Sequence, residues 1–195
     1  MSKKTRTTQD DKRENQQIAL FDLVARKGRS NKYTPDADLM CKGFQYEVEL
    51  KTSDVARKSV STARGVTIEK IDEWRKVPVW VFSQYEKPNK LTGEHYALFR
   101  PQMEAFYEKT IKKIREGTKK LAGLNDWDAA MEILVSSHLD RSLIKKLDYA
   151  MRHKGTALND PKIPWSYVVE NGTKVDSDSD LRMLAIEYKN KENEE

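Results

Sequence analysis

Residues 46–52 alternate between apolar and polar side chains, and this alternation constrains the fold of the chain most closely. Successive side chains of a β-strand point to opposite faces of its sheet. The predicted strand has one apolar face that suits a core: Tyr46, Val48 and Leu50. Its other face is charged: Glu47, Glu49 and Lys51. Because Glu and Lys have low strand propensity, we expect tertiary contacts to hold this segment in a sheet.

A further acidic position precedes this strand. Asp36 follows Pro35, and twelve residues separate it from Glu49. Carboxylate oxygens are hard ligands of the type that suits Mg²⁺, and the Leu50 carbonyl oxygen would add another. Lys51 would place a positive charge beside a phosphate, where it either stabilises developing negative charge or helps to deprotonate water. This combination is typical of metal-assisted hydrolysis.

The pattern Pro35-Asp36 followed by Glu49-Leu50-Lys51 resembles the motif of the PD-(D/E)XK nuclease superfamily, and within it the type II restriction endonucleases. The residue-by-residue resemblance covers positions 34–53, and the order of elements is similar to the family's core over about residues 10–100. The resemblance implies hydrolysis of DNA phosphodiester bonds with Mg²⁺ as cofactor. It also implies Asp36 and Glu49 as metal ligands and Lys51 as the catalytic lysine.

Other acidic residues leave alternatives open. Asp38 lies two residues from Asp36 and would share its face of a strand, but we prefer Asp36 because it follows Pro35. Glu47 shares the charged face. Restriction-type nucleases often place an acid from the first helix near the metal, and Glu14 is the candidate here. The charged ladder is also typical of a solvated edge strand that is protected against unwanted pairing.

The charge balance fits a polyanionic partner. The 195 residues include 36 Lys and Arg against 31 Asp and Glu, which gives a formal net charge of +5, and the sequence pI is about 9.1. Cys41 is the single cysteine, so no intrachain disulfide can form, as is usual in a reducing cytoplasm. No apolar run approaches the roughly 18 residues of a membrane span. We therefore expect a cytoplasmic protein without a membrane partner.

Hydrophobic periodicity and turn residues predict the elements around the motif. We expect a helix over about 10–26 that stops at Gly28, and two strands that turn at Lys42-Gly43. A helix should start at Ser53 or Asp54 and run to about residue 76. A buried strand is predicted at 77–85, a loop at 87–93 and a further strand at 95–100.

This order of elements places a set of polar side chains near the charged face of the motif strand. Three basic residues follow that strand, and two polar residues end the buried strand: Arg57, Lys58, Arg64, Ser83 and Gln84. We expect them to contact DNA, although each basic residue is also compatible with an ordinary solvated helix face.

The remainder of the chain is predicted to be mainly helical. We expect helices at about 101–120, 127–134 and 138–154, with clusters of basic residues that suit phosphate backbones. Asn171-Gly172 predicts the turn of a hairpin over 165–175. A short helix that includes Leu181 and Tyr188, and a disordered tail, complete the prediction.

Together these patterns predict a single α/β domain in which helices flank a mixed sheet. Its restriction-endonuclease-like core spans about residues 10–100, and a helical C-terminal extension over about 101–195 helps to hold DNA. The resemblance implies Mg²⁺-dependent cleavage of double-stranded DNA at a specific sequence by a homodimer. The alternatives are another nuclease of the same superfamily (a junction resolvase, a repair nickase or a transposition subunit) and a non-catalytic basic protein that binds nucleic acid.

Overall fold

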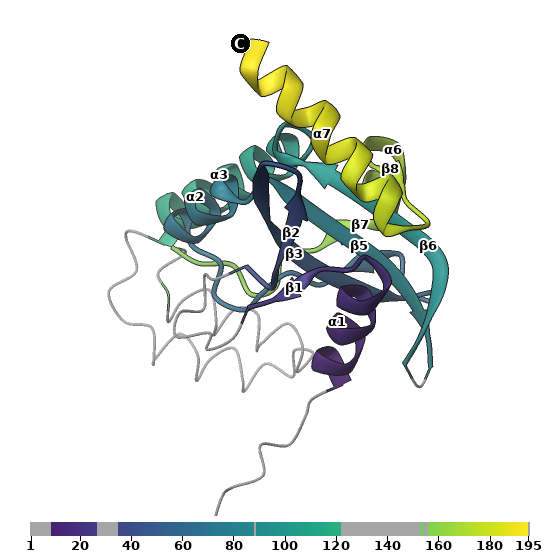
Figure 1. The fold of residues 1–195 in the computed structure, drawn as a ribbon. Helices are drawn as coiled ribbons and strands as arrows, with labels where there is room; N and C mark the ends of the chain where they lie inside the picture. Colours follow the sequence, from purple (N-terminus) through teal and green to yellow (C-terminus); the bar gives the residue numbers. More distant parts are fainter. Residues whose placement is uncertain (1–8, 27–34, 88, 122–152, 154–155, 195) are drawn as a thin grey trace, which may run out of the picture. The chain divides into compact units, whose positions relative to one another are not determined.

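The computed structural model describes residues 9–26, 35–87, 89–121, 153 and 156–194. Within them, six strands form one sheet in the order β1-β2-β3-β5-β6-β8 (Figure 1). The strands are β1 Val24–Ala25, β2 Ala37–Cys41, β3 Phe44–Asp54, β5 Val79–Glu86, β6 Lys90–Phe99 and β8 Thr173–Lys174. β3 and β5 are parallel, whereas the other neighbouring pairs are antiparallel. The predicted α/β class with a mixed sheet is confirmed.

A separate two-stranded sheet pairs β4, Ser59–Val60, with β7, Ile163–Pro164. The helices of the described part are α1 Gln9–Leu20, α2 Ile68–Lys76, α3 Arg100–Leu121, α6 Trp165–Asn171 and α7 Asp178–Glu194. None of these helices is both long and apolar enough to cross a membrane. The predicted helices at 127–134 and 138–154 lie outside the described residues, apart from His153 in a turn.

The chain divides into two compact units. The first unit comprises residues 1–61, 74–104 and 162–195, and it contains both sheets. The second unit comprises residues 62–73 and 105–161, which include most of α2 and α3. β8 and α7, which the sequence assigned to a helical extension, belong to the first unit, where β8 pairs with β6.

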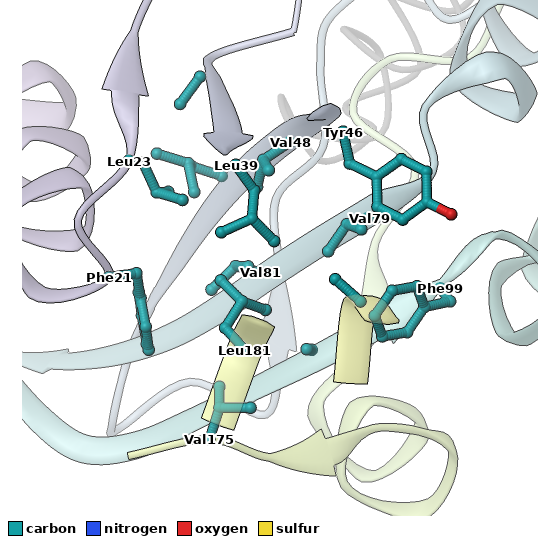
Figure 2. Packing of buried hydrophobic residues seen from close by; sticks show 14 residues of the cluster. Phe21, Leu23, Leu39, Tyr46, Val48, Val79, Val81, Phe99, Val175 and Leu181 are labelled. Carbon is teal, nitrogen blue, oxygen red and sulfur yellow. The ribbon is translucent and has the colours of Figure 1, made fainter. Parts of the chain in front are cut away.

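One face of the six-stranded sheet carries the main apolar core of the first unit (Figure 2). Tyr46, Val48 and Leu50 of β3 are all buried in it, as the alternation predicts. The end of α1 and the inner side of α7 cover this face with Phe21 and Leu181, which are fully buried. The charged residues of β3 therefore lie on the opposite face, where they are available to form a site.

Two predicted strand features are confirmed. β2 and β3 form the expected hairpin, in which Gly43 has a φ of 90°, a left-handed conformation that glycine adopts without strain. β5 is the expected buried strand, and it begins directly after Pro78, which has no N–H to donate to a sheet. Because β5 runs parallel to β3, the two strands end at the same edge of the sheet.

The first helix is shorter than predicted. It ends at Leu20 because Asp22 adopts a left-handed backbone, with a φ of 47°, and the Leu23 N–H donates to the Ile18 carbonyl at 2.9 Å. This is the helix-terminating geometry that usually requires glycine. The predicted stop at Gly28 lies outside the described residues. Val24, which lies within the predicted helix range, is instead 52% exposed in β1.

The helix predicted from Ser53 or Asp54 to residue 76 forms only in its last part, as α2. β3 continues through Asp54, whose carboxylate accepts the Ala56 N–H at 3.0 Å in a local turn. The Ser53 hydroxyl donates to the Ser59 carbonyl at 2.9 Å. Residues that favour helix caps also form such turns, and here the turn prevails. Gly65, with a φ of 64°, lies between this turn and α2.

Three predictions near the surface are also wrong. The loop predicted at 87–93 is a tight connection, because β5 extends to Glu86 and β6 begins at Lys90. The hairpin predicted at 165–175 is helix α6 followed by β8. The predicted disordered tail is helical, since α7 continues to Glu194.

Gly172 marks a close approach between the end of α6 and β6. A Cβ at this position would collide with the Leu98 side chain and the Val168 carbonyl oxygen. We expect Gly172→Ala to lower the free energy of unfolding by about 1–3 kcal/mol in urea titrations. Gly93→Ala is the matched control, because no atom lies within 4 Å of its added Cβ. Equal effects of the two substitutions would contradict this account.

Candidate active site

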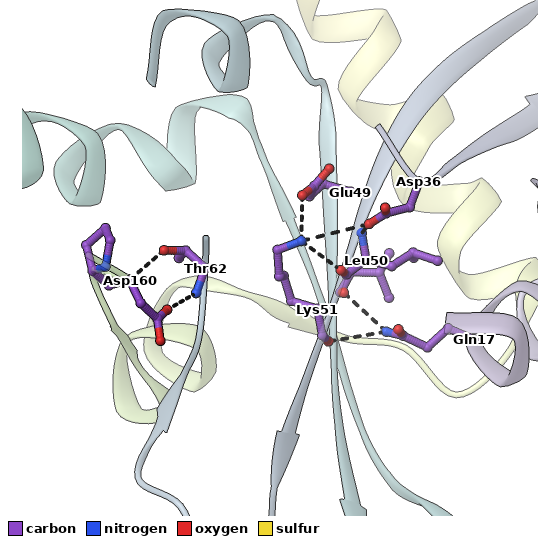
Figure 3. A network of polar contacts seen from close by, with 9 residues as sticks. Gln17, Asp36, Glu49, Leu50, Lys51, Thr62 and Asp160 are labelled. Atoms are coloured by element: carbon purple, nitrogen blue, oxygen red, sulfur yellow. Dashed lines mark hydrogen bonds and ion pairs between the residues drawn. The ribbon is translucent and has the colours of Figure 1, made fainter. Parts of the chain in front are cut away.

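β2 and β3 stop pairing at the start of the motif. Directly before β2 begins, the Asp36 N–H donates to the Val48 carbonyl at 3.0 Å. The next bond to β3 comes from the side chain of Asp36, whose Oδ2 accepts the Leu50 N–H at 2.8 Å (Figure 3). This bond fixes the carboxylate at the fork between the two strands, where Asp36 is 5% exposed.

Glu49 and Lys51 meet Asp36 at this fork. The Nζ of Lys51 lies 2.5 Å from Oε1 of Glu49, 3.0 Å from the Leu50 carbonyl oxygen and 3.8 Å from Oδ2 of Asp36 (Figure 3). The side chains of Glu49 and Lys51 are 12% and 14% exposed. The structure thus brings together the three residues that the sequence predicts as catalytic. All three oxygens predicted as metal ligands converge on one ammonium group.

The electrostatic environment keeps Lys51 charged. Burial disfavours the charged form, but the carboxylates of Glu49 and Asp36 outweigh it and raise the pKa of Lys51 above its ordinary value. Glu14 of α1 contributes to the same shift through its charge, so it lies within electrostatic reach of the site. A lysine that stays protonated at neutral pH is suited to stabilise negative charge and is unsuited to accept a proton from water.

A second pair of acids lies two residues along the same hairpin. Asp38 is directly opposite Glu47 in the β2–β3 register. Like charges in this position repel each other, and Arg26 compensates them. It donates to Asp38 at 2.7 and 2.9 Å and lies 2.7 Å from Glu47. The hydrogen bond to Asp38, together with the bond to Glu47, raises the pKa of Arg26.

This arrangement separates the alternatives that the sequence left open. Asp38 and Glu47 are engaged by a two-pronged guanidinium, whose geometry matches carboxylates closely. Asp36 and Glu49 would oppose each other two residues away in the same register, beyond the Ala37–Val48 pair, and they converge with Lys51. Of the two candidate aspartates, Asp36 is therefore the one at the site.

Gln17 is a site component that sequence reasoning missed. It is fully buried on α1, and its amide Nε2 donates to the carbonyl oxygens of Lys51 at 3.4 Å and Val81 at 3.3 Å and to the Ser83 hydroxyl at 2.8 Å. It thereby ties α1 to β3 and β5 beside Lys51 (Figure 3). The sequence did contain a sign of this role: Gln17 lies four residues before Phe21, so it places a polar side chain in the apolar stripe of the helix.

The five residues predicted to contact DNA differ in their exposure to solvent. Ser83 is fully buried and engaged with Gln17 and His95, so the prediction that it contacts DNA is wrong. The side chain of Ser83 points to the core side because it lies two residues after Val81 on the same face of β5. The remaining residues are accessible: Arg57, Lys58 and Arg64 are exposed, and Gln84 is half-buried. Arg64 belongs to the second unit.

The oxygen atoms at the fork are donors of the type that suits Mg²⁺. Among the described residues, no group of three or more His, Cys, Asp or Glu side chains is arranged to hold a metal ion. Two carboxylates and the Leu50 carbonyl nevertheless surround the ammonium of Lys51. Mg²⁺ is commonly held by one or two carboxylates together with water molecules. The two carboxylates and the carbonyl are thus oxygen donors of the kind that Mg²⁺ takes, and Nζ of Lys51 lies among them in this structure.

His95 gives the first unit a predicted pH dependence. It is 4% exposed, its Nδ1 lies 2.8 Å from the Ser83 hydroxyl, and burial lowers its pKa below the ordinary value of about 6.5. The unfolded chain thus takes up a proton that the folded chain resists, so stability falls as pH drops below about 6.5. Urea unfolding should give a lower free energy at pH 5.5 than at pH 7.5, and the difference should shrink in His95→Gln. An unchanged difference in that variant would exclude His95 as the cause.

The sequence was also compared with known proteins. No protein-family model matches it, and no curated protein matches it significantly.

Proposed function

We propose that this protein is an Mg²⁺-dependent endonuclease of double-stranded DNA, of the type II restriction kind within the PD-(D/E)XK superfamily. The observation that carries the proposal is the convergence of Asp36, Glu49 and the Leu50 carbonyl on the ammonium of Lys51. A mixed sheet with α1 before the motif and a parallel β3–β5 pair supports a core of this kind.

Each residue of the site has a chemical task. Asp36 and Glu49 would hold the ion together with the Leu50 carbonyl. When bound, Mg²⁺ would supply positive charge that polarises a phosphoryl oxygen and lowers the pKa of coordinated water. The ammonium of Lys51 would stabilise the negative charge that develops on the phosphate. Asp36 also orients the Leu50 backbone through the 2.8 Å bond to its N–H.

The charge of the chain supports DNA as the substrate. The formal net charge is +5, and Arg57 and Lys58 are exposed in the turn that follows β3. Such residues neutralise phosphates without reading sequence. Cleavage of both strands at one place requires two active sites, so we propose a homodimer that acts in the cytoplasm.

Incubation with DNA tests the proposal. Purified protein is incubated with plasmid DNA in Mg²⁺ and, in parallel, in a chelator. Discrete fragments that appear only with Mg²⁺ are the expected result. A metal-dependent smear of fragments would indicate a non-specific nuclease. Preferred cleavage of branched or mismatched DNA would favour a resolvase or nickase. DNA binding without any cleavage would favour the non-catalytic alternative and overturn the proposal.

A further inference from the structure

A groove lies in the first unit beyond the carboxyl ends of β3 and β5. It has a volume of about 470 Å³. Its lining combines an aromatic ring, hydrogen-bonding side chains and two cations: Arg57, Lys58, Gln84, Trp165, Ser166 and Glu170. We propose that this groove binds one unstacked nucleotide of the DNA strand, with its base against Trp165 and its phosphate against Arg57 and Lys58. The inference rests on the proposed function only in taking DNA as the ligand.

The sheet register connects the groove to the candidate active site. In the parallel β3–β5 pair, Lys51 is opposite Phe82, and Gln84 follows two residues later. Residues two apart share a face of a strand. Gln84 therefore lies on the face of Glu49 and Lys51, about 7 Å farther along the strand at roughly 3.3 Å per residue. This distance is close to that between successive phosphates of a nucleic-acid strand, so one strand can extend from the site into the groove.

Trp165 is held in place as a stacking surface. Its backbone N–H donates to the Lys58 carbonyl at 2.9 Å, and the preceding Pro164 pairs with Ser59 across the two-stranded sheet. Tyr96 meets the indole edge-to-face, with ring centroids 5.8 Å apart and an interplanar angle of 85°. Because one side of the half-buried ring is packed in this way, its orientation is fixed before a ligand arrives. Base stacking on such a ring tolerates any base.

The exposed surface of the groove is mainly apolar, and charged and hydrogen-bonding side chains lie around it, which suits the flat face and polar edge of a nucleotide. Arg57 and Lys58 supply positive charge for a phosphate, whereas Gln84 and Glu170 offer an amide and a carboxylate to the edge of a base. Val169, which is 44% exposed, adds apolar contact beside them. An unstacked base offers the same combination of a flat apolar face and a polar edge.

Binding of single-stranded DNA in a chelator tests the inference without requiring cleavage. The probe is fluorescein-labelled oligodeoxythymidine of about eight nucleotides, followed by fluorescence anisotropy. Trp165→Ala is expected to weaken binding about 10-fold or more, since it removes the stacking surface. Trp165→Phe should retain most of the affinity. Met183→Ala, a substitution of an exposed apolar residue on α7, is the control and should bind as the wild type does.

A second measurement does not depend on the folding of Trp165→Ala. The oligonucleotide should quench the intrinsic fluorescence of the wild type, and Trp165→Phe should lose this quenching while it still binds. Quenching that persists in Trp165→Phe, or wild-type affinity in a folded Trp165→Ala, would overturn the proposal that this groove binds a nucleotide. If the wild type cuts plasmid DNA but these tests fail, only the groove is lost. If the tests succeed and no DNA is cut, the groove stands and the nuclease proposal fails.

Discussion

Replacement of Lys51 by alanine is expected to lower the rate of Mg²⁺-dependent DNA cleavage by about 10²–10³-fold or more. The ammonium lies between the two carboxylates of the site, and its raised pKa keeps it charged where negative charge would develop. DNA affinity in a chelator should change little, because a single buried cation contributes little to contacts with the phosphate backbone. Initial rates on plasmid DNA and anisotropy on a duplex measure the two effects.

Arg26→Ala is the matched control for this prediction. Arg26 also lies between an Asp and a Glu of the same hairpin, two residues away on each strand. Its removal should leave cleavage within a few-fold of the wild type. Cleavage by Lys51→Ala at the wild-type rate, or an equal loss in both variants, would contradict a specific role for the ammonium.

Replacement of Trp80 by alanine is expected to lower the free energy of unfolding by about 3–5 kcal/mol. The side chain is fully buried on β5, where it stacks on Phe82 with centroids 6.0 Å apart and meets Trp74 edge-to-face at 5.5 Å. Lys51 Nζ also lies 5.6 Å from the centroid of the Trp80 ring. The substitution should therefore reduce cleavage as well, since it removes the support beneath the ammonium.

Urea unfolding followed by circular dichroism measures the effect on stability. Trp80→Phe is the appropriate comparison, because it retains an aromatic ring for Trp74 and Phe82 and should lose clearly less stability than the alanine variant. A loss below about 1 kcal/mol in Trp80→Ala would mean that the ring does not support this face of the sheet.

The sequence contained enough information to place the central strands. The alternation in residues 46–52 predicted which side chains of β3 are buried, because a strand has a fixed two-residue period. The continuous apolar run at β5 likewise predicted a strand buried on both faces. Its parallel pairing with β3 is a finding of the structure. The resemblance of Pro35-Asp36 and Glu49-Leu50-Lys51 to the nuclease motif then implied that Asp36, Glu49 and Lys51 meet.

Other features depended on contacts that periodicity does not encode. Asp22 ends α1 in a left-handed conformation that residue type favours only weakly. Asn171-Gly172 resembled a hairpin turn, yet Gly172 is required by its packing against Leu98. Arg26 engages Asp38 through a register that is fixed only when β1, β2 and β3 assemble. For the same reason, neither the position of Gln17 nor that of Trp165 followed from the motif.

The most direct test of the central claim compares two glutamates on one face of β3. Glu49 converges with Asp36 on Lys51, whereas Glu47, two residues earlier, is bound by Arg26. Mg²⁺-dependent cleavage of plasmid DNA is measured for Glu49→Gln and Glu47→Gln under identical conditions. We predict a loss on the order of 10²-fold or more in Glu49→Gln and little change in Glu47→Gln. Full cleavage by Glu49→Gln would contradict the active site described above.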